Sequence, residues 1–201
     1  REQVAIAINA KPTEIYFTGC GSESDNTALK GVAFANKTKG NHIITSKIEH
    51  PAILDTCKTL EKQGFEVTYL DVDENGLISL EELEKTITDK TILISIMFAN
   101  NEIGTIEPIK KIGEIAKLNN VYFHTDAVQA IGNVRIDVQR MGITEIYSLG
   151  DNIGCGPSPC EVIDLLESYN IKSVAGNSED YCTLGIEPYI NSFNEIKLRS
   201  Q

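Results

Sequence analysis

The chain has little positive charge, with 18 Lys and Arg against 29 Asp and Glu and a net charge of −11 over 201 residues. Nucleic acids and anionic membrane surfaces are bound by basic patches, so neither is expected as a partner. An apolar run of membrane-spanning length is absent, and no signal peptide precedes the first residues. The sequence does not begin with Met, and its opening residues have a helical pattern. We therefore expect a piece of a longer protein.

Cysteine and histidine are both sparse. The five cysteines are scattered and form no Cys-x-x-Cys pair. This arrangement favours reduced thiols in a cytoplasmic protein over a disulfide framework. All three histidines precede residue 125. Their absence from the later part of the chain weighs against a complete transition-metal site there.

Strand and helix patterns alternate along the chain. Strands are predicted at residues 15–18, 42–46, 65–70, 91–97, 121–125 and 146–149, and helices at 23–36, 51–63, 80–86 and 108–118. Such alternation with short connections is typical of an α/β fold, a three-layer sandwich with a mostly parallel sheet between helices. The nearly continuous apolar run at 91–97 indicates a strand buried on both faces. A helix at 159–168 and a strand at 171–175 predict an α/β tail.

Two polar residues follow the strand at 121–125. Asp126 can hold a protonated ring nitrogen, and Gln129, one helical turn later, can reach a neighbouring ring oxygen. An enzyme that uses pyridoxal phosphate needs such a pair, together with a lysine that binds the cofactor as a Schiff base. The next strand should present that lysine, but residues 144–157 contain none.

Other candidate residues follow the earlier predicted strands. Ser22 lies in a run of small residues at the start of a helix, where an anion can bind; the alternative is an ordinary turn capped by Ser22. His50 can stack on a ring or transfer protons, although a lone histidine more often has a structural role. Ligands bind at the carboxyl ends of strands in open α/β sheets. We therefore expect one edge of the sheet to gather Ser22, His50, Asn101, Asp126 and Gln129.

Residues 71–82 match the calcium-binding loop pattern D-x-D-x-N-G-x₅-E. That loop needs a helix before it, whereas residues 65–70 alternate like a strand. The preferred interpretation is a chain reversal at Asn75 and Gly76, followed by a helix that Ser79 caps with Glu82 three residues on.

Two further polar residues lie in glycine-rich segments of the tail. Asp151 and Asn177 both follow strand-like residues, and Asp and Asn in such positions can ligate a divalent metal. The alternative is that both belong to ordinary turns.

Residues 1–143 resemble the large domain of cysteine desulfurases, which are aminotransferase class V enzymes of the pyridoxal phosphate fold type I. The matching runs are FTGCGSESDN at 17–26, IEHP at 48–51, SIMFANNEIG at 95–104 and HTDAVQ at 124–129. The resemblance implies that Gly21 and Ser22 hold the cofactor phosphate, and that His50 stacks on the ring. It also implies that Asp126 pairs with the pyridine nitrogen and that the ring oxygen is contacted by Asn101 and Gln129.

The same resemblance implies sulfur removal from L-cysteine to supply iron–sulfur clusters or thio-cofactors, and possible assembly as a homodimer. Where the family has its Ser-x-His-Lys segment, this chain has residues 148–157 without a lysine. The small domain with the mobile catalytic cysteine loop is also unmatched. An inactive chain is therefore expected.

Residues 144–201 resemble the middle of a calcineurin-like metallophosphoesterase through GDNIGCGPSPCE at 150–161 and Gly-Asn at 176–177. That resemblance implies Asp151 and Asn177 as metal ligands in an incomplete site. The alternatives to an inherited desulfurase are thus a metal-dependent phosphoesterase and a chimeric or truncated chain without catalysis.

Overall fold

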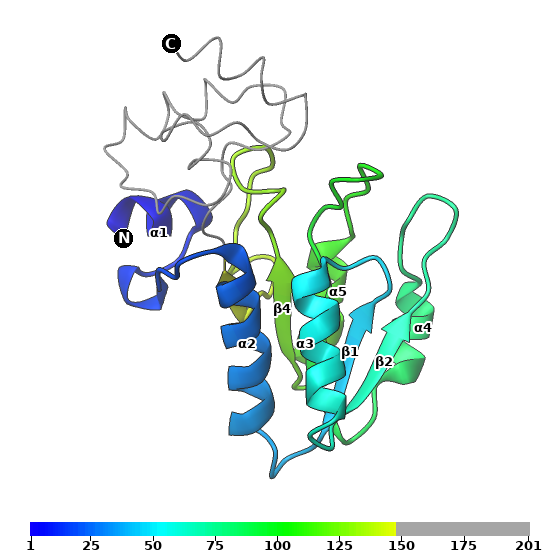
Figure 1. The fold of residues 1–201 in the computed structure, drawn as a ribbon. Helices are drawn as coiled ribbons and strands as arrows, with labels where there is room; N and C mark the ends of the chain where they lie inside the picture. Colours follow the sequence, from blue (N-terminus) through cyan, green and yellow to red (C-terminus); the bar gives the residue numbers. More distant parts are fainter. Residues whose placement is uncertain (148–201) are drawn as a thin grey trace, which may run out of the picture. The chain divides into compact units, whose positions relative to one another are not determined.

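The computed structural model describes residues 1–147 (Figure 1). Of these, residues 1–16 and 22–147 form one compact unit, and Phe17–Gly21 belongs to a second. The elements predicted at 159–168 and 171–175, and the candidate metal ligands Asp151 and Asn177, lie outside the described residues.

A parallel sheet of five strands forms the centre of the first unit, in the order β2-β1-β3-β4-β5. Its strands are β1 (His42–Ser46), β2 (Glu66–Leu70), β3 (Thr91–Ser95), β4 (Tyr122–Asp126) and β5 (Glu145–Tyr147), and every pairing is parallel. The chain adds β2 on one side of β1 and then crosses to add β3 on the other. The carboxyl ends of β1 and β3 therefore form a topological switch point, where ligands commonly bind in open α/β sheets.

Helices cover both faces of this sheet, which confirms the predicted three-layer α/β fold (Figure 1). The helices are α1 (Glu2–Ile8), α2 (Gly21–Ala35), α3 (Pro51–Glu61), α4 (Leu80–Thr86) and α5 (Ile109–Leu118), with a 3₁₀ turn at Pro12–Glu14. Ile43 and Leu93 pack with residues of α2 and α3 in one apolar cluster. Ile44 and Ile94, the next residues of the same strands, pack with residues of α4 and α5 in a second cluster. Side chains alternate across a strand, so the two clusters lie on opposite faces.

The strand predicted at residues 15–18 is wrong, because those residues are assigned neither to a strand nor to a helix. Ile15 is buried, but Tyr16 is 63% exposed. A short apolar run can have the pattern of a strand, but a strand forms only where a neighbouring strand hydrogen-bonds to it. The 3₁₀ turn at Pro12–Glu14 leads into this segment and was not predicted.

The turn predicted within residues 71–82 is confirmed. Val72 and Ile78 form an antiparallel bridge, and Gly76 between them has a φ of +79° that favours glycine. Asp73 Oδ1 accepts the main-chain N–H of Asn75 and Leu77 at 2.8 and 2.9 Å, so this carboxylate is part of the turn. At the start of α4, Ser79 Oγ accepts the N–H of Glu82 at 3.2 Å, the predicted cap.

Within residues 1–147, none of the helices is both long and apolar enough to cross a membrane. The same part of the chain contains no group of three or more His, Cys, Asp or Glu side chains arranged to hold a metal ion.

Candidate active site

The candidate site lies at the carboxyl edge of the sheet, where β1, β3 and β4 end. His50 follows β1 and is the residue before helix α3. Asn101 follows β3 in a turn, and Asp126 is the last residue of β4. Because these strands are parallel neighbours, their carboxyl ends lie at the same edge of the sheet.

Asp126 is a buried carboxylate with one main-chain donor. The residue is 8% exposed, and its Oδ1 accepts the N–H of Val128 at 3.0 Å. Burial raises the pKa of Asp126, while the Val128 N–H and the positive form of His50 lower it. A cationic group such as a protonated ring nitrogen would stabilise the charged form of this carboxylate.

His50 caps helix α3. Its Nδ1 accepts the main-chain N–H of Ala52 at 3.1 Å, and Pro51 occupies the first helical position. With Nδ1 acting as the acceptor, the ring proton is on Nε2. The structural role considered for His50 is therefore present, and it fixes the exposed imidazole at the edge of the sheet.

Of the remaining predicted ligands, Ser22, Asn101 and Gln129 are exposed and Gly21 is half-buried. Asn101 and Gln129 lie in turns, and the turns at residues 127–134 are held by main-chain bonds such as Ile131 N–H to Ala127 O at 3.0 Å. Gly21 and Ser22 are the first two residues of α2. Asp25, one turn after Ser22, lies 3.8 Å from His124 of β4, so the amino end of α2 passes over this strand.

The turn that presents Asn101 is organised by its neighbour Asn100. The side-chain amide of Asn100 donates to Ile48 O at 3.0 Å, and its carbonyl oxygen accepts the N–H of Glu102 and Ile103 at 2.8 and 3.1 Å. Asn100 thereby ties the segment after β3 to the segment after β1. Two neighbouring asparagines thus have different environments, because one is buried in the turn and the other faces solvent.

A layer of buried ionisable side chains beneath this edge was not predicted. Asp25 of α2 and His124 of β4 are 2% and 0% exposed, and the His124 Nδ1 lies 2.8 Å from Ser95 Oγ. Within the described residues, His124 Nε2 and Asp25 Oδ1 have no hydrogen-bond partner. The available signal was an ionisable residue inside an otherwise apolar strand, which indicates a buried polar function for His124.

Glu49 belongs to the same layer. Its Oε1 accepts the hydroxyl of Ser46 at 2.7 Å and the N–H of Met97 at 2.8 Å, and its Oε2 is buried without a partner among residues 1–147. Burial, the largest effect, raises the pKa of Glu49 to about 8 despite these donors. Burial and then the charge of Asp126 raise the pKa of Asp25 to about 8. Burial also lowers the pKa of the His124 imidazole to about 3.

These shifts decide between two descriptions of the Asp25 and His124 pair. The 3.8 Å between Asp25 Oδ1 and His124 Nε2 is short enough for an ion pair. Both pKa shifts nevertheless favour the neutral forms of the two side chains. Because no Lys or Arg within residues 1–147 forms an ion pair with Asp25 to compensate its burial, the neutral pair is the physically consistent one.

The side chains in place suit pyridoxal phosphate only in part. The buried Asp126 carboxylate suits a protonated pyridine nitrogen, and the exposed imidazole of His50 is free to cover a ring. Residues 144–157 supply no lysine. Lys47 directly follows β1 but is paired with Asp71 at 2.5 Å.

The thiols of the described residues do not form a nucleophilic centre at this edge. Cys57 is buried in the apolar cluster of α2 and α3, and burial raises its pKa to about 12. A thiol that remains protonated at neutral pH is a poor nucleophile. Cys20 is exposed, and both are unbonded to other cysteines.

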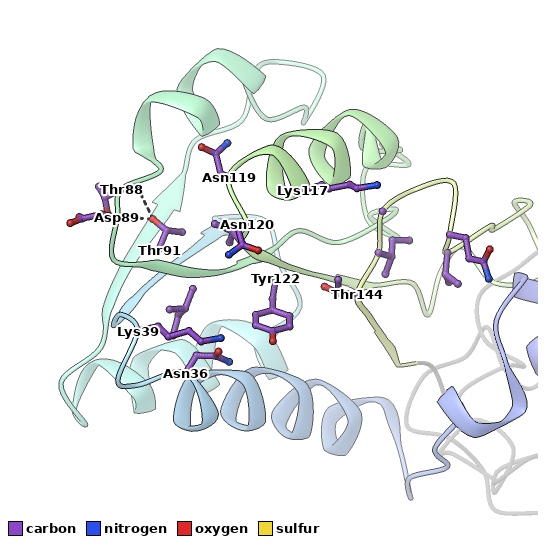
Figure 2. Close-up of a pocket in the computed structure, with 16 residues that line it drawn as sticks. Asn36, Lys39, Thr88, Asp89, Thr91, Lys117, Asn119, Asn120, Tyr122 and Thr144 are labelled. Carbon is purple, nitrogen blue, oxygen red and sulfur yellow. Dashed lines mark hydrogen bonds between the residues drawn. The ribbon is translucent and has the colours of Figure 1, made fainter.

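A pocket of about 590 Å³ lies at the opposite edge of the sheet, at the amino ends of β3 and β4 (Figure 2). Thr91 and Tyr122, the first residues of those strands, line it together with Lys39 and Lys117. The Lys39 ammonium lies 5.9 Å from the centre of the Tyr122 ring. None of the residues predicted from the sequence to bind a cofactor lines this pocket.

Comparison with known proteins assigns the family. The aminotransferase class-V family matches residues 1–157. The chain is 63% identical over 157 residues to cysteine desulfurase IscS of Clostridium botulinum (strain Kyoto / Type A2), covering 78% of this chain and 39% of the relative. It is 59% identical over 171 residues to cysteine desulfurase IscS of Methanosarcina thermophila, covering 85% of this chain and 42% of the relative.

Solved structures agree with the sequence comparison. A structure described as SspA in complex with cysteine superposes with a TM-score of 0.70 at 46% identity, over 72% of this chain and 42% of the other. DndA from Streptomyces lividans superposes with a TM-score of 0.70 at 36% identity, over 77% of this chain and 43% of the other. The chain belongs to the aminotransferase class-V family, and its relatives there are cysteine desulfurases.

The chain spans about two fifths of the length of these curated relatives. The family match continues to residue 157 and so includes the first part of the segment likened to metallophosphoesterases. The domain boundary at 143 and the phosphoesterase-like origin of residues 144–201 stay predictions.

Proposed function

We propose that this chain is the cofactor-binding part of a cysteine desulfurase-like protein, and that by itself it binds pyridoxal phosphate without removing sulfur from L-cysteine. The observation that supports cofactor binding is the buried Asp126 carboxylate at the end of β4, at the sheet edge where His50 follows β1 and near the switch point of the sheet. Relatives that are cysteine desulfurases support L-cysteine as the substrate of the whole protein.

Each residue has a distinct part in this proposal. Asp126 holds a proton on the ring nitrogen by remaining ionised, and His50 covers one face of the ring. Asn101 and Gln129 donate to the ring oxygen from their amide groups, and Gly21 with Ser22 binds the phosphate at the start of α2. When bound, the cofactor withdraws electrons from the substrate carbon.

The proposed lack of turnover depends on the lysine. Pyridoxal phosphate enzymes bind their cofactor covalently through a lysine, which exchanges with the substrate amine. Residues 144–157, within the family match, contain no lysine. Without that residue, the substrate amine has no covalent lysine linkage to displace.

Absorbance during titration with pyridoxal phosphate tests the proposal, followed by borohydride reduction and peptide mapping of the same samples. We expect saturable binding at neutral pH with no single reducible lysine adduct. The matched variant Asp126→Asn keeps the shape of the side chain and removes its charge. Loss of a charge-assisted hydrogen bond should weaken binding by about tenfold or more.

Two results would contradict the proposal in different ways. No saturable binding by the wild-type chain would remove the cofactor-binding function. A reducible adduct on one lysine would show that a substitute lysine reaches the cofactor, and Lys47→Ala tests the residue that directly follows β1. Sulfide release from L-cysteine by the chain would likewise contradict the proposed lack of sulfur removal.

Metal-dependent phosphoester hydrolysis is the second proposal, supported by the glycine-rich pattern around Asp151 and by Asn177 in the sequence. It uses a divalent metal in place of pyridoxal phosphate. Hydrolysis of a generic phosphomonoester with added Mn²⁺, lost in Asp151→Asn, would establish it; the same rate in the variant would reject it.

Assembly as a homodimer and a cytoplasmic location are also proposed from the resemblance to desulfurases. Light scattering of the purified chain would measure its mass in solution. A monomer at all concentrations would contradict the dimer.

A further inference from the structure

The buried layer beneath the candidate site holds more carboxyl groups than cations. Asp25, Glu49 and Asp126 are each less than 9% exposed, and the ionisable side chains that face them are the imidazoles of His124 and His50 and the thiol of Cys57. No Lys or Arg forms an ion pair with these carboxyl groups within residues 1–147. Three carboxylates that are buried together without a paired cation cannot all be ionised. At least one of these carboxyl groups must therefore stay protonated.

The hydrogen-bond partners distinguish the carboxyl groups. Asp126 accepts the N–H of Val128 at 3.0 Å, a bond that favours its ionised form. Asp25 Oδ1 has no such donor within the described residues and instead faces the unpartnered Nε2 of His124 at 3.8 Å. A carboxylic acid would satisfy both atoms with one hydrogen bond after a small approach, whereas a carboxylate and a neutral Nε2 acceptor would repel.

The imidazole of His124 completes this arrangement. If the Asp25 hydroxyl donates to Nε2, then Nδ1 has the ring proton and donates to Ser95 Oγ at 2.8 Å. Each polar atom of Ser95, His124 and Asp25 along this path then has one partner. Two alternatives differ in charge. An imidazolium beside a carboxylate would bury two charges next to the charge of Asp126. A neutral His124 that donates from Nε2–H to an ionised Asp25, with Ser95 donating to Nδ1, would bury a second carboxylate charge next to that of Asp126.

We propose that Asp25 is a positioning residue that stays protonated and donates to Nε2 of His124, so that the negative charge facing a bound ring is on Asp126. This inference rests on the proposed binding of pyridoxal phosphate for its role, but not for the proton position itself. A second carboxylate beside Asp126 would raise the proton affinity of Asp126 and weaken its ability to hold a proton on the ring nitrogen. Keeping Asp25 neutral removes that competition.

The proton position is measured first in the full-length wild-type chain without cofactor. Nitrogen-15 NMR of the histidine side chains distinguishes the two neutral tautomers and the imidazolium. We expect His124 to have its proton on Nδ1, with Nε2 unprotonated, from pH 6 to pH 7.5. An imidazolium or an Nε2–H tautomer of His124 in that range would overturn the proposal without any variant having to fold.

Asp25→Asn and Asp126→Asn then separate the two carboxyl groups. An amide at position 25 is neutral and can still donate to Nε2, so Asp25→Asn should keep the His124 tautomer and an affinity for pyridoxal phosphate close to that of the wild type at pH 7. Asp126→Asn should lose about tenfold or more in affinity. Equal losses in both variants would show that Asp25 contributes charge and would overturn the proposal.

Failure of the proposed function gives a different result. A wild-type chain that binds no cofactor but shows His124 protonated on Nδ1 would reject cofactor binding and retain the proton on Asp25. Saturable cofactor binding by a chain whose His124 is charged would retain the proposed cofactor binding and reject the proton on Asp25.

Discussion

The main-chain N–H of Met97 donates to Oε1 of Glu49 at 2.8 Å, which joins the turn after β1 to the segment after β3. Glu49 immediately precedes His50, and Met97 precedes the turn of Asn100 and Asn101. A single carboxyl group therefore fixes the spacing between two parts of the candidate site. The bond also explains why an ionisable side chain is buried here, because its removal would leave the Met97 N–H without this acceptor.

Glu49 is expected to make the stability of the chain fall as pH rises. Its pKa is raised from 4.5 in the unfolded chain to about 8 in the folded one, so between these values the folded chain binds more protons. The stability contributed by this group is fully present below pH 4.5 and lost as pH approaches 8. Each pH unit in that window should cost about 1.4 kcal/mol per proton.

Urea unfolding of Glu49→Gln between pH 5 and pH 9 measures this effect. Gln retains the Oε1 acceptor for Ser46 and Met97 but cannot ionise, so we expect a flatter pH dependence than in the wild type. The exposed Glu84→Gln on α4 is the control and should keep the wild-type slope. An unchanged slope in Glu49→Gln would mean that Glu49 is ionised at little cost.

Asn100 and Asn101 are expected to separate stability from cofactor binding. Asn100→Ala removes the bonds to Ile48, Glu102 and Ile103 and should destabilise the chain by about 2–3 kcal/mol. Asn101 is exposed, so Asn101→Ala should leave the unfolding free energy within about 0.5 kcal/mol of the wild type. The same variant should weaken pyridoxal phosphate binding, which absorbance titration measures. Normal binding by Asn101→Ala would remove this residue from the proposed site.

His50 is expected to have two functions that different substitutions separate. His50→Ala removes the acceptor for Ala52 N–H and should cost about 1 kcal/mol. His50→Asn restores a helix-capping oxygen and should recover that stability, but it should not restore cofactor affinity, because Asn has no ring to stack. Recovery of both properties in His50→Asn would show that the imidazole acts only as a cap.

The sequence predicted the parts of the fold that depend on local patterns. β1 begins at His42 and ends at Ser46 as expected, because an apolar run between turn residues defines it. The cap of α4 by Ser79 was also predictable, because donor and acceptor are three residues apart. The strand at 15–18 failed because a strand depends on its neighbours.

The buried layer could not be predicted for the same reason. Asp25 and His124 belong to α2 and β4, and their proximity depends on how the helix crosses the sheet. The sequence placed Asp126 and His50 at the ends of strands. In a parallel sheet, the carboxyl ends of neighbouring strands lie at the same edge. It could not show that Asp25 faces inward, since an acidic residue near the start of a helix is equally often exposed.

Two glycines in helices should respond in opposite ways to substitution by alanine. A Cβ on Gly113 of α5 would lie 1.9 Å from the main-chain oxygen of Met141, so Gly113→Ala must displace the segment that leads into β5. We expect a loss of about 1–3 kcal/mol. Gly31 of α2 is exposed, with nothing within 4 Å of the position of a Cβ, so Gly31→Ala should gain about 0.5–1 kcal/mol from helix propensity.

Urea unfolding of both variants measures the difference, and amide hydrogen exchange locates it. In Gly113→Ala, faster exchange is expected at Thr144, whose N–H and hydroxyl both bond to Phe123 O of β4 at 3.1 and 2.9 Å. Slower exchange in α2 should accompany the gain in Gly31→Ala. Wild-type stability and exchange in Gly113→Ala would show that residues 141–144 do not pack against α5, and the position of β5 beside β4 would then lose its support.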